Sequence, residues 1–228
     1  TDQIHAIEAL VRIDSPEHGL IPPAAFIETA EESNLINELG DSILEVILQD
    51  VSDWSRQGVT PRMSINVSAI QLSQENFADK LLQKIISHGL KPDRFEIEIT
   101  ENILIQNMEQ SLNNIVKLTK HNLTIAIDDF GTGYSSLSYL DQLPLHTLKL
   151  DKSFMKKIVN ANDDNTIIPA MLGVSNGLRL DFIAEGIETL AQHQYLKSLG
   201  SCIAQGYYYS RPIDRDRMLE YIRGYRRG

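Results

Sequence analysis

The sequence predicts an α/β fold in which strands and helices alternate around a parallel barrel, with one strand fewer than eight. Three observations support this prediction: seven short runs with strand periodicity, helical patterns between them, and a length of 228 residues. Strands that alternate with helices form parallel sheets, and an eight-stranded (β/α)8 barrel typically takes about 250 residues. We expect the initial strand to lie outside these residues, because the sequence begins almost directly on a strand. The alternative is an open doubly wound sheet, which is disfavoured because no glycine-rich phosphate turn follows the first strand.

The first elements are predicted from side-chain alternation and from the positions of proline and glycine. Residues 4–13 and 62–68 have the two-residue period of strands. Between them, residues 22–34 begin with prolines, which a helix tolerates in its first turn. Residues 41–58 carry apolar side chains at helical spacing and end at a glycine, a common helix terminator. The chain is therefore expected to start with a strand, two helices and a second strand.

The middle of the chain repeats this alternation. Residues 74–89 form a predicted helix that ends on a glycine, and residues 95–101 form the third strand. A helical pattern over residues 107–122 leads into the fourth strand at 123–130. On these strands the aliphatic side chains share one parity and the polar side chains share the other. We therefore expect the aliphatic face to pack under the helices and the polar face to point toward the barrel axis.

The last third of the chain contains three further predicted strands and three helices. One of the helices has Pro169 near its first turn, where the missing backbone donor costs least. In chain order the elements are a strand at 147–154, a helix at 165–178, a strand at 180–188, a helix at 189–200, a strand at 202–209 and a helix at 214–228. We expect the whole chain, residues 1–228, to form a single domain.

Composition indicates a protein of a reducing, aqueous compartment. Hydrophobic residues make up 42% of the chain, enough for a sizeable core. The net charge of -10 argues against nucleic-acid polymers and anionic membranes as partners, since both require a basic face. Cys202 is the one cysteine, so no internal disulfide can form. Without a bilayer-spanning stretch or a signal peptide, we expect a cytoplasmic location, alone or as the cytoplasmic part of a larger membrane-bound protein.

Polar side chains recur near the carboxyl ends of the predicted strands, where (β/α)8 barrels carry their active sites. Taken alone, a glutamate there is usually a solvated loop residue, and Lys149 would more often be a surface lysine. Glu96 also fits pairing with a base near the barrel floor. Recurrence at seven positions is harder to attribute to chance. We expect seven residues to converge, namely Glu8, Asn66, Glu98, Asp128, Lys149, Glu185 and Gln205.

Two adjacent carboxylates, Asp128 and Asp129, lead directly into a glycine-rich turn. Together with three glutamates they carry a charge of about -5, and Lys149 returns about +1, so they cannot all stay ionised without cations. Two divalent ions would balance the remainder, and all-oxygen ligands favour Mg²⁺ or Mn²⁺ over Zn²⁺. Paired ions of this kind commonly serve in-line attack on phosphodiesters. The five carboxylates are Glu8, Glu98, Asp128, Asp129 and Glu185.

A series of motifs runs in order along the chain. Residues 8–12 read EALVR, and DDFGTGYSS begins at Asp128. The other stretches are NVS from 66, EITE from 98, LPLHTLKLD ending at Asp151, EGIE from 185 and QGYYYSRP from 205. Through these motifs nearly the whole chain resembles the EAL domain family of bacterial cyclic-di-GMP phosphodiesterases. The resemblance implies a modified TIM (β/α)8 barrel with one antiparallel strand.

The resemblance also implies ligands and chemistry. One divalent ion, Mg²⁺ or Mn²⁺, would be held by Glu8, Asn66, Glu98 and Asp128, and the other by Asp128, Asp129 and Glu185. A water activated by the ions would attack a phosphorus of cyclic di-GMP and give linear pGpG. Glu185 would act as base or as ligand. Ca²⁺ is expected to bind and to inhibit, because its looser coordination suits the in-line reaction badly.

Further roles follow from the same resemblance. Lys149 would position the attacking oxygen and neutralise developing charge, Arg12 would clamp a phosphate, and Gln205 would orient substrate or water. Glu101 and the loop at 130–140 resemble the regulatory loop that ties the metal site to the dimer interface. The family resemblance thus predicts a homodimer, linked to a preceding sensory or regulatory domain.

Two departures from the family pattern concern the barrel and one side chain. The family usually opens with a tyrosine-glutamine-proline stretch, which is absent here and would supply the missing strand. Cys202 occupies a position where aspartate is common, outside the metal set, so we expect little effect on chemistry.

Three functions are compatible with this sequence. A metal-dependent hydrolase leads, because degenerate family members usually lose one of the carboxylates and none is missing here. The alternative is a catalytically inactive receptor that binds cyclic di-GMP and signals through another domain. A purely structural module gives no reason for the carboxylate cluster. Nucleotide binding without turnover would separate the second function from the first.

Overall fold

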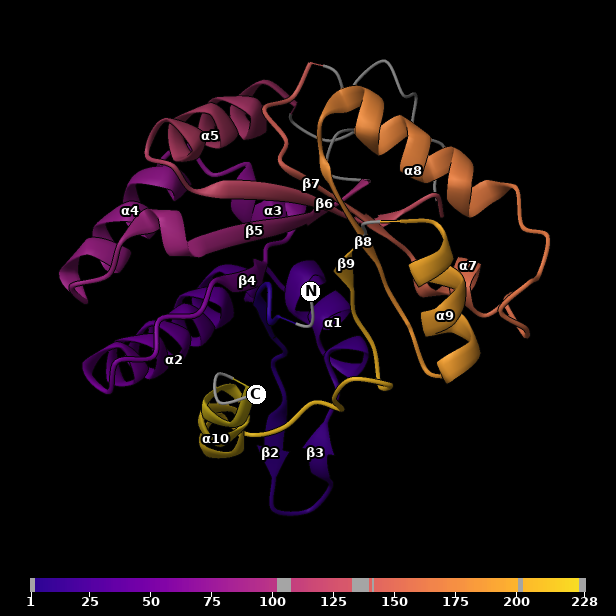
Figure 1. The fold of residues 1–228 in the computed structure, drawn as a ribbon. Helices are drawn as coiled ribbons and strands as arrows, with labels where there is room; N and C mark the ends of the chain where they lie inside the picture. The colour runs from indigo at the N-terminus through magenta and orange to yellow at the C-terminus, as the bar shows by residue number, and fades with distance from the viewer. Residues whose placement is uncertain (1–2, 102–107, 133–139, 141, 201–202, 226–228) are drawn as a thin grey trace.

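The computed structural model of the protein describes residues 3–101, 108–132, 140, 142–200 and 203–225. Within these ranges seven strands form one curled sheet in the order β1-β4-β5-β6-β7-β8-β9 (Figure 1). Each strand lies beside its predecessor, whereas a doubly wound sheet reverses its order at a switch point. The barrel prediction is therefore confirmed. The strands are β1 Ile7–Ala9, β4 Met63–Asn66, β5 Phe95–Thr100, β6 Thr124–Phe130, β7 Thr147–Leu150, β8 Asp181–Ala184 and β9 Ile203–Ala204.

The sheet does not close between β1 and β9. No backbone hydrogen bond joins these two strands among the residues that the structure describes. All six strand pairings are parallel. The antiparallel strand that the family resemblance implies is thus absent from the described part of the sheet. The result is a half-open barrel with one strand too few, as the count of seven strands predicts.

Helices cover the outer face of the sheet, and Figure 1 shows α4 and α5 on one side and α8 and α9 on the other. Their apolar faces pack against the aliphatic side chains that point outward from the strands. Among these side chains, Ile97, Ile125 and Leu148 are fully buried. This layer forms the main hydrophobic core. The covering helices are α2 Ile36–Arg56, α4 Phe77–Ser87, α5 Met108–Lys120, α8 Ile167–Leu178 and α9 Leu190–Ser198, while α10 Arg215–Tyr225 lies against α2.

The chain between β1 and α2 differs most from the sequence prediction. The predicted strand at 4–13 is split, because a separate antiparallel hairpin forms from β2 Ile13–Ser15 and β3 Gly19–Ile21. In place of the helix at 22–34 there is a 3₁₀ turn, η1 Pro23–Ala25, followed by the short helix α1 Ile27–Glu32. Asn34 then adopts a left-handed conformation with φ of 60°, which ends α1 and lets α2 begin five residues earlier than predicted.

Three short helical turns complete the structure. They are α3 Ala69–Leu72, η2 Pro92–Arg94 and α7 Lys152–Met155. The predicted strand at 147–154 ends at Leu150, because the Asp151 side chain accepts a hydrogen bond from the Ser153 N–H at 2.9 Å and starts α7. The last of these turns therefore begins immediately after β7.

The polar parity of the strands points into the barrel. Glu96 on β5 is fully buried and accepts hydrogen bonds from Ser64 Oγ (3.1 Å), Thr124 Oγ1 (3.3 Å) and Thr147 Oγ1 (2.7 Å). These donors come from three other strands, so all four side chains share the interior. Hydroxyl groups therefore take the place of the base that the sequence suggested for Glu96, since short Ser and Thr side chains fit between the strands.

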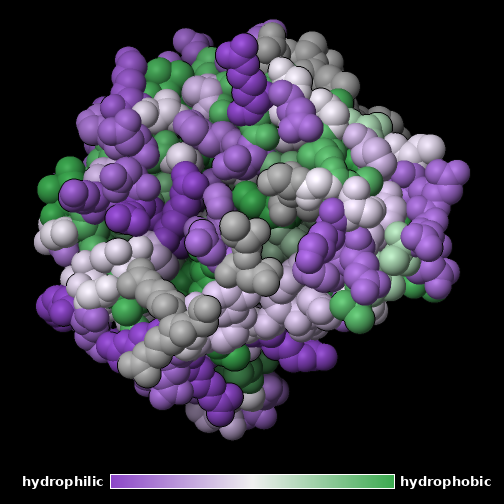
Figure 2. All heavy atoms as spheres, in the orientation of Figure 1, coloured by the Kyte–Doolittle hydropathy of each residue, from purple (hydrophilic) through white to green (hydrophobic). Residues whose placement is uncertain are grey.

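The C-terminal helix α10 lies against α2. Arg215 donates to Asp50 at 2.6 Å and to Asp53 at 2.9 Å. No helix in the described ranges has both the length and the apolarity to cross a bilayer. On the face seen in Figure 2, hydrophilic side chains dominate and hydrophobic residues show in separate small areas.

Several sequence predictions lie wholly or partly outside the described residues. They concern Cys202, residues 133–139 and 141 of the predicted regulatory loop and its surroundings, residue 107 at the start of one predicted helix, and residues 226–228 at the end of the last one.

Candidate functional site

Lys149 lies at the centre of a ring of carboxylates inside the barrel. Its side chain is fully buried, with 0% exposure. Its Nζ lies 2.8 Å from Glu98 Oε2, 2.8 Å from Glu185 Oε1, 3.2 Å from Asp128 Oδ1 and 3.8 Å from Glu8 Oε2. These residues stand on β7, β5, the end of β8, β6 and β1 respectively. Because parallel strands of a barrel bring their carboxyl ends to one rim, residues far apart in sequence meet here.

Two side-chain amides hold the Glu8 carboxylate. Asn66 Nδ2 donates to Glu8 Oε1 at 2.8 Å, and Gln205 Nε2 donates to Glu8 Oε2 at 2.6 Å. Asn66 ends β4, whereas Gln205 follows β9 on the other side of the barrel opening. The second hydrogen bond therefore spans the gap between β1 and β9 that no backbone hydrogen bond closes in the described residues.

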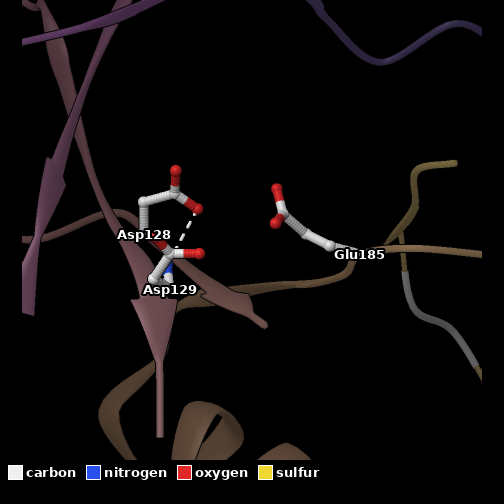
Figure 3. A group of neighbouring side chains, drawn as sticks. All are labelled: Asp128, Asp129 and Glu185. Atoms are coloured by element: carbon white, nitrogen blue, oxygen red, sulfur yellow. Dashed lines mark hydrogen bonds between the residues drawn. The ribbon is translucent and has the colours of Figure 1, made fainter. Parts of the chain in front are cut away.

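A β-bulge orients Asp128 and Asp129. Neighbouring residues of a regular strand point to opposite faces, but the register of β6 against β7 shifts between Ile127 and Phe130. Asp129 has φ of 53°, and its N–H donates to Asp128 Oδ1 at 2.9 Å (Figure 3). Bulges of this kind re-aim side chains near active sites. Both carboxylates consequently lie on the side of Glu185, which Figure 3 shows facing them from another element.

The electrostatics of the ring follow from burial and crowding. Burial raises the pKa of Glu98 well above its usual range, and the neighbouring Glu8 and Asp128 raise it further while Lys149 lowers it. Burial also raises the pKa of Glu185, to about 7. Burial alone would lower the pKa of Lys149, but the surrounding carboxylates, Glu98 first, raise it overall. Lys149 is therefore a permanent cation in a ring that favours partial protonation.

The donor set fits a hard divalent cation. Asp128, Asp129 and Glu185 each offer one carboxylate oxygen, and these oxygens lie within 4.8 Å of one another. The buried Glu98 Oε2 lies 2.8 Å from Lys149 Nζ in the same ring. Ligands of oxygen alone suit Mg²⁺ or Mn²⁺. The residues present thus fit the metal site that the sequence predicts.

Two predicted residues lie outside this ring. Arg12 is exposed, and its Nη1 donates to the carbonyl of Val11 at 2.7 Å. Glu101 is buried and accepts a hydrogen bond from the Gly131 N–H at 3.3 Å. Glu101 therefore touches the turn that follows β6, the strand that carries Asp128 and Asp129.

Asp151 belongs to the same neighbourhood, although the sequence analysis gave it no role. Its carboxyl group interacts with that of Asp129. Burial, followed by the charges of Asp128 and Asp151, raises the pKa of Asp129, so this carboxyl group is harder to ionise than an exposed aspartate. The sequence could have indicated Asp151 as a site residue. Asp151 follows Lys149 by two residues, and side chains two apart on a strand point to the same face.

A cavity of about 880 Å³ opens between β1 and β9 and reaches the ring. Glu8, Glu98 and Gln205 line its polar end. The remainder of the lining mixes apolar and aromatic side chains, such as Leu10 and Tyr207, with polar and charged ones, such as His193 and Arg211. A concave site with apolar walls and a few convergent polar groups is typical of small-molecule binding.

Comparison with known proteins gives a consistent result. The family model for the EAL domain matches residues 1–212. MucR of Pseudomonas aeruginosa, a bifunctional diguanylate cyclase/cyclic di-GMP phosphodiesterase, is 35% identical over 93% of this chain and 31% of its own length. The cyclic di-GMP phosphodiesterase PdeR of Escherichia coli is 36% identical over 92% of this chain and 32% of its own length. The chain thus spans about a third of these curated relatives.

Solved structures show the same fold. The structure described as PaMucR phosphodiesterase in complex with c-di-GMP superposes with a TM-score of 0.86 and 34% identity, covering 92% of this chain and 86% of that chain. Bd1971, described as an EAL enzyme bound to cAMP and cyclic-di-GMP, gives a TM-score of 0.86 with 33% identity over 94% of this chain and 59% of that chain.

Proposed function

The chain belongs to the EAL domain family, and on that premise we propose that it is a divalent-metal-dependent phosphodiesterase that hydrolyses cyclic di-GMP to linear pGpG. The observation that carries this proposal is the buried Lys149 inside a ring of four strand-end carboxylates. A ring of this kind concentrates negative charge beside a cavity, and only cations make that arrangement useful for binding a phosphate ester.

The metal ligands in this proposal come from five strands. Glu8, Asn66, Glu98 and Asp128 would hold one ion, and Asp128, Asp129 and Glu185 would hold the other. When bound, the two ions would supply positive charge for the phosphate oxygens and lower the pKa of a water molecule. The bulge at Asp128 and Asp129 supports this assignment, because it turns two consecutive carboxylates to one side.

The chain's own residues would perform the remaining steps. Lys149 Nζ, fixed in the interior, would stabilise the negative charge that develops on the phosphate oxygens during attack. Glu185 would act either as the base that accepts the proton of the attacking water or as a metal ligand, and with no ion bound burial raises its pKa to about 7. Gln205 would orient substrate or water from the rim, and Arg12 would turn from Val11 to clamp a phosphate.

The proposed substrate suits the cavity between β1 and β9. A volume of about 880 Å³ lies within the range of sites for drug-sized ligands, and two carboxylates of the ring, Glu8 and Glu98, line the cavity. The solved relative with 34% identity is described as a c-di-GMP complex. We infer that the dinucleotide places one phosphate at the ring and extends its bases along the cavity, where Leu10 and Tyr207 are among the lining residues.

The proposal extends to assembly. Homodimerisation, linkage to an N-terminal sensory or regulatory domain, and a regulatory role for Glu101 all stay predictions of family membership. The curated relatives are about three times as long as this chain, which supports its being one module of a larger signalling protein.

The first test is a chromatographic assay. Purified protein is incubated with cyclic di-GMP and Mg²⁺, and the products are resolved over time, with a chelator in the control. We expect pGpG to appear only with the metal present. Nucleotide binding without product would favour the receptor alternative or an effect of the open barrel. Repeating the assay with a chain extended at its N-terminus by a family-type first strand would distinguish those two outcomes.

A further inference from the structure

The Lys149 ammonium lies inside the ring and is paired most closely with two carboxylates. Its Nζ is 2.8 Å from Glu98 Oε2 and 2.8 Å from Glu185 Oε1. The contacts to Asp128 and Glu8, at 3.2 and 3.8 Å, are longer still. A cation surrounded by carboxylate oxygens at these distances offsets their negative charge, as a bound metal ion would.

The ammonium cannot leave this position easily. All four residues of β7, Thr147–Leu150, are buried. Leu148 and Leu150 on the other parity are packed into the hydrophobic core. Lys149 thus extends into the interior from a strand that is buried along its whole length, and moving its ammonium to solvent would break its close contacts with Glu98 and Glu185.

The carboxylates around Lys149 include the proposed ligands of both divalent ions. Without a cation, four carboxylates within reach of one point would repel one another strongly. With Lys149 present, a divalent ion that enters the ring binds carboxylate oxygens that are already paired with the ammonium. The ion must also come close to the ammonium, and two positive charges at such distances repel each other in a buried site.

We propose that Lys149 is a built-in counter-cation, which holds the metal-free ring together and weakens its affinity for divalent ions. The proposal rests on the proposed function only in taking the ring to be a divalent-metal site. It gives Lys149 a second role besides charge stabilisation during phosphodiester hydrolysis. Metal occupancy would accordingly follow the available Mg²⁺ or Mn²⁺ concentration instead of remaining saturated.

The test measures metal binding and stability, without reference to turnover. Mn²⁺ is titrated calorimetrically into wild type, Lys149→Met and Lys149→Gln, all stripped with chelator and dialysed. Lys120→Met, which alters an exposed lysine in the last turn of α5, is the matched control. We expect both Lys149 variants to bind Mn²⁺ at least about tenfold more tightly than wild type, because a repelling charge is gone. Lys120→Met should bind like wild type.

Melting temperatures supply the second readout. In chelator both Lys149 variants should melt below wild type, and Mn²⁺ should raise their melting temperatures by more than it raises that of wild type. If Lys149→Met is unfolded in chelator, refolding on addition of Mn²⁺ supports the proposal, and Lys149→Gln supplies the affinity.

Two results would overturn the inference in distinguishable ways. Equal or weaker Mn²⁺ binding by a folded Lys149→Gln, with normal binding by wild type, would reject the counter-cation and leave the proposed phosphodiesterase intact. Absence of Mn²⁺ binding in wild type and in every variant would reject the metal site itself, and both proposals with it.

Discussion

Glu8 is the residue at which the two sides of the barrel opening meet. Asn66 on β4 and Gln205 beyond β9 each donate to one of its oxygens, at 2.8 and 2.6 Å. Its Oε2 also lies 3.8 Å from Lys149 Nζ. A single carboxylate thus connects the first strand, the last strand and the central cation.

Replacing Glu8 should therefore abolish catalysis. Glu8→Ala removes a proposed metal ligand and leaves the Asn66 and Gln205 amides without their acceptor, so we expect hydrolysis of cyclic di-GMP to fall at least about a hundredfold. Initial rates of pGpG formation measure this, with Glu109→Ala, an exposed glutamate of α5, as the control. A near-wild-type rate in Glu8→Ala would contradict the metal assignment.

His146 predicts a pH dependence of stability that is independent of the ring. Burial, with help from Arg62, lowers the pKa of His146 below its usual 6.5, while Glu96 and Asp181 oppose the shift. Its Nδ1 accepts a hydrogen bond from the Ile125 N–H at 3.3 Å, which requires the neutral ring. The unfolded chain therefore binds the proton more readily, so this stability is complete above pH 6.5 and is lost as the pH falls below that value.

The comparison variant is His146→Asn, whose side-chain oxygen can accept the same hydrogen bond without titrating. Between about pH 7.5 and about pH 5.5, wild type should lose more free energy of unfolding than His146→Asn. Urea unfolding followed by circular dichroism measures both proteins at each pH. Parallel losses in the two proteins would show that His146 does not contribute.

Among the elements, the end of β8 and the start of α7 approach each other closely near the site. Gly186 follows Glu185 and has φ of 70°. A Cβ added there would lie 2.4 Å from Lys152 Cβ and 3.0 Å from Lys152 Cα, at the start of α7. Glycine is therefore required at this position both by the backbone conformation and by the available space.

Gly186→Ala should destabilise the protein by about 1–3 kcal/mol, because the strained backbone and the contact with α7 must both be accommodated. Gly173→Ala is the matched control. Gly173 lies in the interior of α8 with no atom within 4 Å of its added Cβ, so alanine there should stabilise by about 0.5–1 kcal/mol. Chemical denaturation of the two variants should give opposite signs, and equal effects would contradict the packing account.

The sequence predicted some of the strands and helices and missed others. The alternation of apolar and polar residues predicted the strands, because successive side chains face the helices and the barrel interior in turn. Ile97 and Glu96 on β5 are an example. The hairpin β2–β3 was missed because its three-residue strands are too short for periodicity to register. The early start of α2 depends on Asn34 taking a left-handed conformation, which its neighbours in sequence do not reveal.

At the scale of the whole molecule, the ring couples metal binding to folding. Its carboxylates come from strands that span almost the entire chain, and they converge only in the folded state. Ligands that bind only the folded state stabilise it by mass action. A divalent ion should therefore report on the integrity of the complete barrel.

We expect saturating Mg²⁺ or Mn²⁺ to raise the melting temperature of wild type by about 5–10 °C relative to chelator, which corresponds to an excess of about a hundredfold over Kd. Differential scanning fluorimetry measures the shift, and titration with NaCl at matched ionic strength controls for screening. A melting curve indifferent to chelator and metal would contradict a cation-dependent ring.

How much of the site the sequence could predict depends on the origin of each contact. Strand parity placed Glu98, Asp128 and Lys149 together, because side chains on one face of adjacent parallel strands converge at the rim. It could not foresee that the bulge would turn Asp129 to the same side, since the bulge depends on pairing between β6 and β7. Nor could it locate Arg12, whose position depends on the loop between β1 and the hairpin.

The opening between β1 and β9 leaves one carboxylate of the ring, Glu8, less firmly held than the others. Glu98, Asp128 and Lys149 stand on strands that each have a neighbour on both sides. Glu8 stands on an edge strand, so small outward movements along this seam would separate it from Gln205 and from Lys149 while the other distances stay constant. The site thus has a rigid part, formed by residues on interior strands, and one movable ligand, Glu8. Strain applied at the opening between β1 and β9 would change metal coordination through Glu8 alone.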